Sequence, residues 1–349
     1  MKSLLERSHQ TRIIQSSDFI GSMLELIQPG KVLLITSKGF SKRGLTKKIQ
    51  NVLGADNVVV HDQITPNPEL TDIQHWAEIL SLESFSNIVV LGGGSAIDTA
   101  KVFSRLLIEP GLSLKSMLNS SAREVKKGIL LIAIPTTSGT GAEVTSFATV
   151  WDSSEQKKYS LTQVAPDFAI LDPSLTLTLA RQDTLYPALD ALSHALESLW
   201  NKNRTRESES FAIEAIDKIC VALPQVLNEP DNLAARRDMQ GAATLAGLAI
   251  SQTRTAIAHA ISYPLTLKYG VPHGLACSYT IPAIIDKFGA LKLKLNQNTV
   301  DMVLELFNKI SLENELQKFV SQHDMTEQAS GELDPSRMGN FIQSVSSMI

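Results

Sequence analysis

The chain has 349 residues, of which 43% are hydrophobic and 19% are charged, and its formal net charge is -4. This composition is typical of a globular protein with a sizeable core and excludes a largely disordered chain. The slight negative charge argues against a broad basic surface for nucleic acid, and no apolar run reaches the roughly 20 residues that span a bilayer. We therefore expect neither nucleic acid nor a membrane as a partner.

The two cysteines, Cys220 and Cys277, are too few for a disulfide framework. The first ten residues, MKSLLERSHQ, mix both charges and lack the apolar core of a signal peptide. Together these features favour a protein of the reducing cytoplasm. The chain length predicts two domains, at the usual size of about 100–200 residues each, with one large domain as the alternative.

Short apolar runs rich in β-branched residues alternate with helix-like segments through the first half of the chain. Such continuous runs are typical of strands buried on both faces of a largely parallel sheet. We therefore predict an α/β domain over residues 1–177. Its strands are expected at Lys31–Thr36, Asn57–Val60, Asn87–Leu91, Ile129–Ile134 and Asp167–Leu171.

The second half contains long helical patterns rich in alanine and leucine. We predict an all-helical domain over residues 178–349. Because proline interrupts a helix, we expect the third of its long helices to end before Pro264. The helical patterns cover Ala188–Leu199, Ser208–Val226 and Leu233–Ile261.

A glycine turn directly follows the predicted strand at Asn87–Leu91 and leads into a helical segment. Such a turn lets the backbone approach a ligand closely, and the start of a helix offers free N–H groups to an anion. The spacing differs from G-x-G-x-x-G, so a tight structural turn is the alternative interpretation. Asp98 lies in the first helical turn, where a carboxylate also suits the helix dipole. The turn consists of Gly92, Gly93, Gly94 and Ser95.

A second polar loop, Pro135–Glu143, follows the next strong strand. Its hydroxyl groups and glycines can supply hydrogen bonds and a close backbone approach, and an ordinary capped loop is the alternative. Two such loops at the ends of neighbouring strands favour a ligand site, because open α/β sheets bind ligands there. The hydroxyl residues are Thr136, Thr137, Ser138 and Thr140.

One carboxylate and three histidines lie in apolar parts of the second half. Asp190 and His194 are four residues apart, which stacks them on one helical face. His259 and His273 come from later helical segments. Each histidine alone is best explained as a core residue satisfied by the backbone. Their joint occurrence favours a divalent metal site with one position open for substrate.

The chain resembles the iron-dependent (group III) alcohol dehydrogenase family over roughly residues 10–320. The matching segments occur in the family's order and at similar spacing. The resemblance implies a Rossmann-like N-terminal domain and a helical C-terminal domain, the architecture shared with dehydroquinate synthase. The segments are GGGSAIDTAK (Gly92–Lys101), PTTSGTGAEVT (Pro135–Thr145), PDFAILDPSLT (Pro166–Thr176), DALSHALES (Asp190–Ser198), AHAISYP (Ala258–Pro264) and PHG (Pro272–Gly274).

The resemblance also implies cofactors and an assembly. Fe²⁺, with Zn²⁺ as the alternative, would be held by the positions Asp190, His194, His259 and His273. The GGGS and TTSGTG segments match the family's nicotinamide-dinucleotide site, and Lys158 is expected to help hold that cofactor. The family further implies a homodimer. Cys277 lies four residues after His273, and it is interpreted as a small core residue, with a position near the metal as the alternative.

The position after the first strand departs from the family's pattern. Many members that use NAD carry an acidic residue there, whereas this chain has Ser37 followed by Lys38. Losing a carboxylate and adding a cation favours a 2′-phosphate. We therefore predict that NADPH is used at least as well as NADH, and a solvated basic loop is the alternative.

Two further departures lie near His259. Arg254 occupies an apolar helical stretch where relatives have small residues, so it is expected to hold an anionic substrate group, with an internal salt bridge or a surface position as the alternative. Tyr263 stands where relatives often have a second histidine. We expect it to relay the alkoxide proton or to bind substrate, and a packing role is the alternative.

The segment Ser251–Cys277 is most similar to the family's phosphonate-metabolism branch. That branch reduces phosphonoacetaldehyde to 2-hydroxyethylphosphonate, a small anionic aldehyde to its alcohol. Sulfoacetaldehyde or a short-chain aldehyde is the alternative substrate. A lyase related to dehydroquinate synthase is the alternative of another class, and a non-catalytic binding protein is a third.

Overall fold

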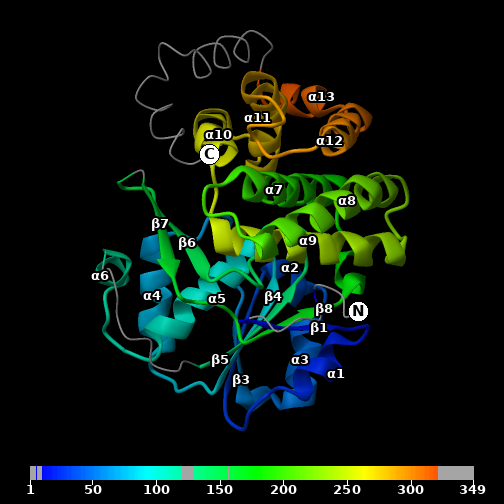
Figure 1. Ribbon diagram of the computed structural model, residues 1–349. Helices are drawn as coiled ribbons and strands as arrows, with labels where there is room; N and C mark the ends of the chain where they lie inside the picture. Colours follow the sequence, from blue (N-terminus) through cyan, green and yellow to red (C-terminus); the bar gives the residue numbers. More distant parts are fainter. Residues whose placement is uncertain (1–4, 6–9, 120–128, 156, 321–349) are drawn as a thin grey trace. The chain divides into compact units, whose positions relative to one another are not determined.

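The computed structural model describes residues 5, 10–119, 129–155 and 157–320 of the chain. The chain forms two compact units (Figure 1). The first consists of Met1–Thr137 and Ala142–Leu175, and the second of Ser138–Gly141 and Thr176–Ile349. Four residues of the second polar loop therefore belong to the second unit, although the chain before and after them belongs to the first.

The first unit is built on a six-stranded parallel sheet in the order β1-β8-β5-β4-β2-β3. The five strands expected from the sequence are all present, and the predicted α/β class is confirmed. The edge strand β1 was not expected, because its four residues, RIIQ, lack a continuous apolar run. The strands are β1 (Arg12–Gln15), β2 (Val32–Thr36), β3 (Val58–His61), β4 (Asn87–Gly92), β5 (Leu130–Pro135) and β8 (Phe168–Leu171).

Helices cover both faces of this sheet, as Figure 1 shows. On β2, Leu33 and Ile35 pack into the core on the side of α4 and α5, whereas Val32 and Leu34 pack on the side of α1 and α3. Alternate side chains of a strand point to opposite faces, so a strand covered on both faces is apolar throughout. The helices are α1 (Phe19–Leu24), α2 (Lys38–Lys42), α3 (Leu45–Leu53), α4 (Leu70–Leu80), α5 (Gly94–Leu106) and α6 (Leu114–Asn119).

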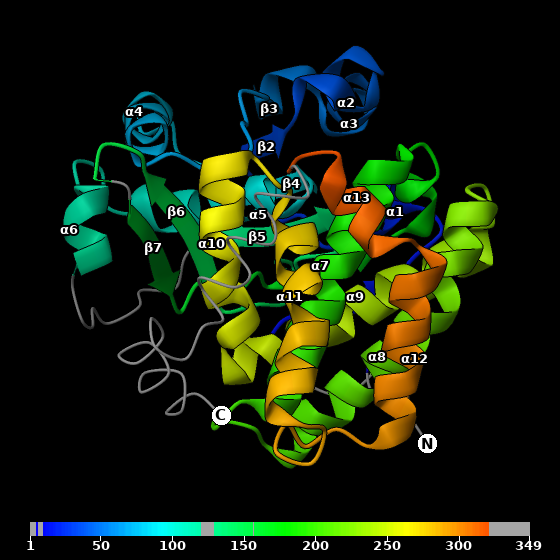
Figure 2. The same cartoon turned by 90° about the horizontal axis from the view of Figure 1, so that it is seen from above.

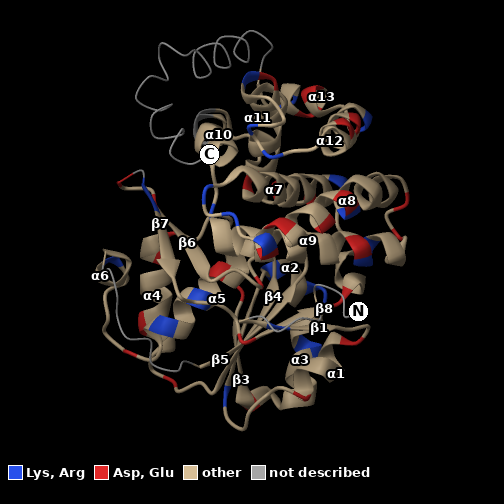
Figure 3. Cartoon of the chain, viewed as in Figure 1, with Lys and Arg blue, Asp and Glu red and all other residues tan. Residues whose placement is uncertain are grey.

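The strand order reverses direction between β2 and β4. From β2 the chain passes to the edge strand β3 and then returns to β4 on the other side of β2. Open α/β sheets bind ligands at the carboxyl ends of the strands beside such a reversal. The inner strands β8, β5, β4 and β2 contain no charged residue. Figure 3 shows charges of this unit on its helices and loops and on the β6–β7 hairpin.

An antiparallel hairpin was not expected from the sequence. It pairs β6 (Phe147–Asp152) with β7 (Lys157–Thr162). In β6 buried and half-buried residues alternate, so the apolar stretch is too interrupted to stand out as a buried strand. Ala148 and Val150 of the hairpin join the core on the α5 face of the sheet.

The second unit is helical over the residues that the structure describes, apart from its connecting loops. Its longest helices, α7, α8 and α9, pack against one another, α11 packs on α7, and α12 packs on α8 (Figure 2). None of the described helices is both long and apolar enough to cross a membrane. The helices are α7 (Arg181–Trp200), α8 (Arg206–Asn228), α9 (Leu233–Thr253), α10 (Ile257–Tyr269), α11 (His273–Phe288), α12 (Gln297–Lys309) and α13 (Leu312–Gln317).

The prediction of one helix over Leu233–Ile261 that ends before Pro264 is wrong on two counts. The helix breaks after Thr253, and a new helix, α10, runs through Pro264 to Tyr269. The break is tertiary in origin, because the side-chain amides of Asn201 and Asn203 donate to the carbonyls of Arg254 and Thr253. A proline removes one helical hydrogen bond, and packing of α10 on α11 and α7 offsets that loss.

Candidate functional site

Helix α7 places three ionisable side chains on one buried face. Asp190, His194 and Glu197 are separated by four and three residues, the spacing that aligns side chains along one side of a helix. Their relative exposures are 4%, 7% and 0%. The surrounding alanines and leucines bury this face, so each polar group needs a charge or hydrogen-bond partner.

Three imidazoles surround one carboxylate oxygen. Oδ1 of Asp190 lies 3.7 Å from Nε2 of His194, 3.5 Å from Nε2 of His259 and 3.9 Å from Nε2 of His273. The rings of His194 and His259 are stacked, with centroids 4.9 Å apart. Helices α7, α10 and α11 thus bring together all four residues that the sequence proposes as metal ligands.

Buried polar atoms at this centre lack partners among the described residues. Oδ1 of Asp190 and Nε2 of His259 are inaccessible to solvent and form no hydrogen bond. Leaving such groups unsatisfied is costly. A divalent cation would satisfy both at once, and one carboxylate with several imidazoles is a donor set that Fe²⁺ or Zn²⁺ accepts. The residues therefore fit the metal that the sequence resemblance implies.

Charge and burial set the protonation of these groups. Burial raises the pKa of Asp190, but the neighbouring His194, His259 and His273 more than offset this and hold it well below its usual range. Burial lowers the pKa of His194 to about 4. At neutral pH the carboxylate is therefore ionised and the His194 ring is neutral, and these are the forms that bind metals.

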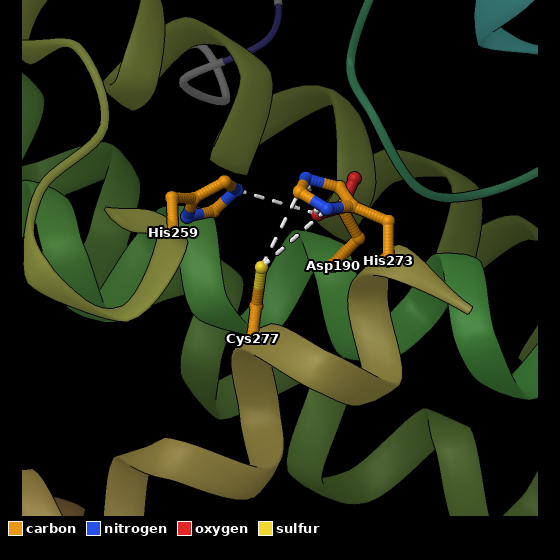
Figure 4. A group of neighbouring side chains, drawn as sticks. All are labelled: Asp190, His259, His273 and Cys277. Carbon is orange, nitrogen blue, oxygen red and sulfur yellow. Dashed lines mark hydrogen bonds and ion pairs between the residues drawn. The ribbon is translucent and has the colours of Figure 1, made fainter. Parts of the chain in front are cut away.

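Cys277 also belongs to this centre. It is fully buried, as expected for a core residue, but its Sγ lies 3.9 Å from both ring nitrogens of His273. One donor atom from each of Asp190, His259, His273 and Cys277 falls within 4.8 Å of all the others (Figure 4). Burial raises the pKa of a thiol, but the rings of His259 and His273 outweigh it and lower the pKa of Cys277 to about 6.

Glu197 is a site residue that the sequence analysis missed. Its carboxylate accepts from Nδ1 of His259 at 2.6 Å and from the backbone N–H groups of Ala256 and His259 at 2.9 and 3.1 Å. It therefore orients the His259 ring and caps the start of α10 at the same time. Carboxylates that hold the second nitrogen of a metal-binding histidine are common. Its position three residues after His194, on the same face of α7, is the feature of the sequence that could have identified it.

Gly274 permits the close approach of α11 to α7. A Cβ at this position would overlap the carbonyl oxygen of Tyr186 and lie 2.7 Å from the backbone nitrogen of Asp190. The helices are joined further by Ser278, whose hydroxyl donates to the carbonyl of Leu189 at 2.9 Å. These contacts fix His273, next to Gly274, against Asp190.

In the first unit, the expected glycine turn lies at the carboxyl end of the sheet. Gly92 pairs with Pro135, and the N–H of Thr136 donates to the Gly92 carbonyl at 3.0 Å. A Cβ on Gly92 would lie 2.6 Å from the Cβ of Ala96, so only glycine fits. Helix α5 begins at Gly94, and the first N–H groups of a helix have no partner within it. The turn thus offers backbone donors to an anion.

The hydroxyl residues of the second loop are divided between the two units. Thr136 and Thr137 follow β5, and the Thr137 Oγ1 lies 3.1 Å from where a Cβ of Gly93 would be. Ser138 and Thr140 belong to the short segment of the second unit. That segment is held by its glycines, because a Cβ on Gly141 would overlap Gly247 of α9.

Asp98 lies beyond the first turn of α5, which corrects the expected position, and it is engaged inside the first unit. Its Oδ2 accepts from the N–H of Thr149 at 2.9 Å, and its Oδ1 lies 3.5 Å from Nζ of Lys101. Lys101 is fully buried and donates to Oγ1 of Thr145 at 2.9 Å and to the carbonyl of Phe147 at 2.7 Å. The sequence pattern alone did not indicate this role for Lys101. Asp98 thus ties α5 to β6.

The remaining cofactor candidates lie at separate points of the first unit. Ser37 is the residue before α2 and follows Thr36, which pairs with Leu91 of β4, so Ser37 and Lys38 lie at the reversal of strand order. Lys158 lies on β7, with its Nζ 5.4 Å from the centre of the Trp151 ring.

Arg254 lies between helices rather than within one, which corrects the sequence-based placement. It is the C-cap residue of α9. Its φ of 70° and ψ of 171° are a conformation that strains a residue other than glycine. Its guanidinium is half-buried, and this burial lowers its pKa. Tyr263 lies in α10, four residues after His259, and its side chain is outside the part that the structure describes.

Two family models match the chain. One, described as iron-containing alcohol dehydrogenase, covers residues 10–173. The other, described as the C-terminal region of the Fe-containing alcohol dehydrogenase family, covers residues 184–322. The matched regions include the glycine turn, the second polar loop and all four proposed metal ligands.

Several proteins of similar sequence or structure are named as reductases or dehydrogenases. Phosphonoacetaldehyde reductase of Streptomyces viridochromogenes is 33% identical over 265 residues, which cover 73% of this chain and 66%, about two thirds, of that protein. The 1-propanol dehydrogenase of Citrobacter freundii is 34% identical over 80% of this chain and 72% of that protein. The crystal structure of sulfoacetaldehyde reductase from Bifidobacterium kashiwanohense, solved with NAD⁺, shares the fold: its TM-score is 0.79 at 24% identity, over 97% of this chain and 98% of that chain.

Proposed function

The chain belongs to the iron-containing alcohol dehydrogenase family, and we propose that it reduces phosphonoacetaldehyde to 2-hydroxyethylphosphonate with NADPH or NADH. One observation carries the metal-dependent part of this proposal. Three imidazoles surround the carboxylate oxygen of Asp190, and that oxygen is buried without a hydrogen bond. This is a set of donors that needs a cation to complete it.

In the proposed enzyme, Asp190, His194, His259 and His273 hold Fe²⁺, with Zn²⁺ as the alternative. Such an ion acts as a Lewis acid toward the aldehyde oxygen. Glu197 keeps the His259 ring oriented through the 2.6 Å contact with Nδ1. Gly274 keeps α11, and with it His273, close to α7. These contacts give the donors a preformed arrangement.

The carboxyl end of the sheet is the proposed binding region for the dinucleotide. The backbone of Gly92, Gly93 and Gly94 and the start of α5 suit a pyrophosphate. Ser37 and Lys38 lie beside this turn, at the end of β2, and suit a 2′-phosphate better than an acidic residue would. The other proposed contacts come from Ser95, Asp98, Thr136, Thr137, Ser138, Thr140 and Lys158.

Two residues near His259 are proposed to act on the substrate. Arg254 pairs with the phosphonate, since a half-buried guanidinium gains from an anion. Tyr263, four residues after His259 in α10, is proposed to donate the proton. A bound nicotinamide would supply the hydride for the carbonyl carbon, and with the proton added to the oxygen the products would be the alcohol and NAD(P)⁺.

The substrate class is tested by parallel assays of the Fe²⁺-loaded enzyme, prepared without oxygen, on phosphonoacetaldehyde, sulfoacetaldehyde and butanal. We expect the highest kcat/KM for phosphonoacetaldehyde. Arg254→Ala should lower that value by at least roughly 30-fold, because truncating one partner of a charge pair that is desolvated on binding costs about 2 kcal/mol or more. Its value for butanal should stay unchanged, and Arg237→Ala, at an exposed position of α9, is the control.

Other results would favour the alternatives. A preference for butanal with no effect of Arg254→Ala would contradict the phosphonate proposal and favour a short-chain alcohol dehydrogenase, like the 1-propanol dehydrogenase. A preference for sulfoacetaldehyde would favour that anion instead. Turnover without stoichiometric oxidation of NADPH would contradict a reductase and favour a lyase.

A further inference from the structure

Cys277 is a buried donor at the metal centre that the proposed four-ligand set does not use. It lies four residues after His273 on α11, so the two side chains stand one turn apart on the same helical face. Figure 4 shows its sulfur directed toward the ring of His273, with Asp190 and His259 beside that ring. A core-filling role alone would not require this direction.

The distances suit coordination of a single ion. Metal bonds of about 2.0–2.3 Å place neighbouring donor atoms about 2.8–3.8 Å apart, the lower values at the right angles of a five- or six-coordinate ion and the upper values at tetrahedral angles. The Asp190 oxygen and the His259 nitrogen are 3.5 Å apart, and the Cys277 sulfur and the His273 nitrogens are 3.9 Å apart. All four donors lie within 4.8 Å of one another. A small contraction around an ion would bring the sulfur into bonding distance.

Two independent features of the site point to a ligand there. Oδ1 of Asp190 and Nε2 of His259 are buried and form no hydrogen bond with the described residues, and both belong to the same group as the cysteine sulfur. The other ring nitrogen of His259 is already held by Glu197. The free Nε2 is therefore aimed into the group by a fixed hydrogen bond.

We propose that the Cys277 thiolate is a further ligand of the ion held by Asp190, His194, His259 and His273. The inference rests on the metal centre of the proposed function and adds sulfur to its nitrogen and oxygen donors. Thiolates favour soft and borderline ions such as Zn²⁺, whereas carboxylates and water suit Mn²⁺ or Mg²⁺. Cys277 thus raises the selectivity of the centre for Zn²⁺ over Mn²⁺.

Cobalt provides the direct test, because Co²⁺ bound to thiolate shows a sulfur-to-cobalt charge-transfer band in the near ultraviolet that nitrogen and oxygen ligands do not give. We expect the full-length protein loaded with Co²⁺ to show this band. Cys277→Ser should lose it but keep the weaker visible bands of bound cobalt. The control is Cys220→Ser, because Cys220 lies on α8 and outside the donor group; this variant should keep the band.

Zinc affinity gives a second measurement, made by competition with a chelator. Loss of a residue that only supports a ligand typically costs 10–100-fold in metal affinity, so Cys277→Ser should weaken Zn²⁺ binding at least roughly tenfold. Mn²⁺ binding should change much less. Visible cobalt bands without a charge-transfer band in the wild-type protein, or an unchanged band in Cys277→Ser, would overturn the thiolate ligand and leave the four-ligand centre intact. Absence of cobalt binding altogether would overturn the centre itself.

Discussion

The two units differ in whether their buried charged groups form hydrogen bonds within the protein. In the first unit, the buried Lys101 is paired with Asp98 and hydrogen-bonded to Thr145 and the Phe147 carbonyl. In the second, the buried Asp190 oxygen faces three imidazoles without forming a hydrogen bond. The first set is satisfied by the protein alone, whereas the second leaves buried atoms without hydrogen bonds, which we propose that a cation satisfies. Burial of charge by itself therefore does not mark a site; the unsatisfied atoms do.

The largest expected effect is at the unsatisfied carboxylate. Asp190→Asn removes the only anionic oxygen among the four proposed ligands. Loss of a supporting residue already costs 10–100-fold in metal affinity or activity, so this change should lower Zn²⁺ affinity by at least roughly 100-fold. The fold should survive, because no hydrogen bond of Oδ1 is lost. Calorimetric titration measures the Zn²⁺ affinity, and the melting temperature of the metal-free protein shows whether the fold survives. An unchanged Zn²⁺ affinity would contradict the role of Asp190 as a metal ligand.

Substitution in the ion pair of Lys101 and Asp98 should lower the stability of the protein and leave its metal binding unchanged. Lys101→Met leaves Asp98 buried without its cation, and breaking a buried ion pair typically costs about 3–5 kcal/mol of stability. We expect unfolding of the first unit at a clearly lower urea concentration, with Zn²⁺ binding by the second unit retained. Lys47→Met is the control, since Lys47 is exposed on α3. Equal stability of both variants would show that the pair contributes nothing.

An intermediate effect is expected at Glu197, a positioning residue. Glu197→Gln keeps the size of the side chain but replaces the charged acceptor of the His259 Nδ1 contact. We expect metal affinity and kcat/KM to fall about 10–100-fold. Glu214→Gln is the matched control, because Glu214 forms only a partly exposed ion pair with Lys218 on α8. If the two variants bind zinc equally well, Glu197 serves only to cap α10.

Some elements and site residues could be predicted from sequence patterns alone. The strands β2, β4 and β5 could be predicted because both faces of the sheet are covered, which makes each strand apolar throughout. The pair Asp190 and His194 could be predicted because a single helix sets its geometry. The hairpin β6–β7 was missed, since its alternating burial gives a weaker signal.

Features that depend on contacts between helices could not be predicted from the sequence pattern. The break at Arg254 follows from amides of Asn201 and Asn203, which are about fifty residues away in the chain. Glu197 is recognisable as a polar residue on the right face of α7, but its role requires the position of α10. Cys277 likewise looks like a core residue until α11 is placed against α7.

The smallest expected effect concerns the cofactor. Ser37→Asp would restore an acidic residue at the end of β2, next to β4 in the sheet. It should move the preference from NADPH toward NADH by about tenfold, the equivalent of a charge-assisted hydrogen bond of about 1.5 kcal/mol. Paired steady-state assays with the two cofactors measure it. A wild-type enzyme that already prefers NADH strongly would contradict the proposed role of Ser37 and Lys38.

The central claim is that Asp190 and the surrounding imidazoles bind one divalent cation. Crystals of the zinc-loaded protein, measured on both sides of the zinc absorption edge, test it most directly. The account predicts a single anomalous peak within about 2.0–2.3 Å of the Asp190 oxygen and the histidine nitrogens. A stoichiometric zinc ion bound elsewhere in the chain, or no peak at this centre, would contradict it.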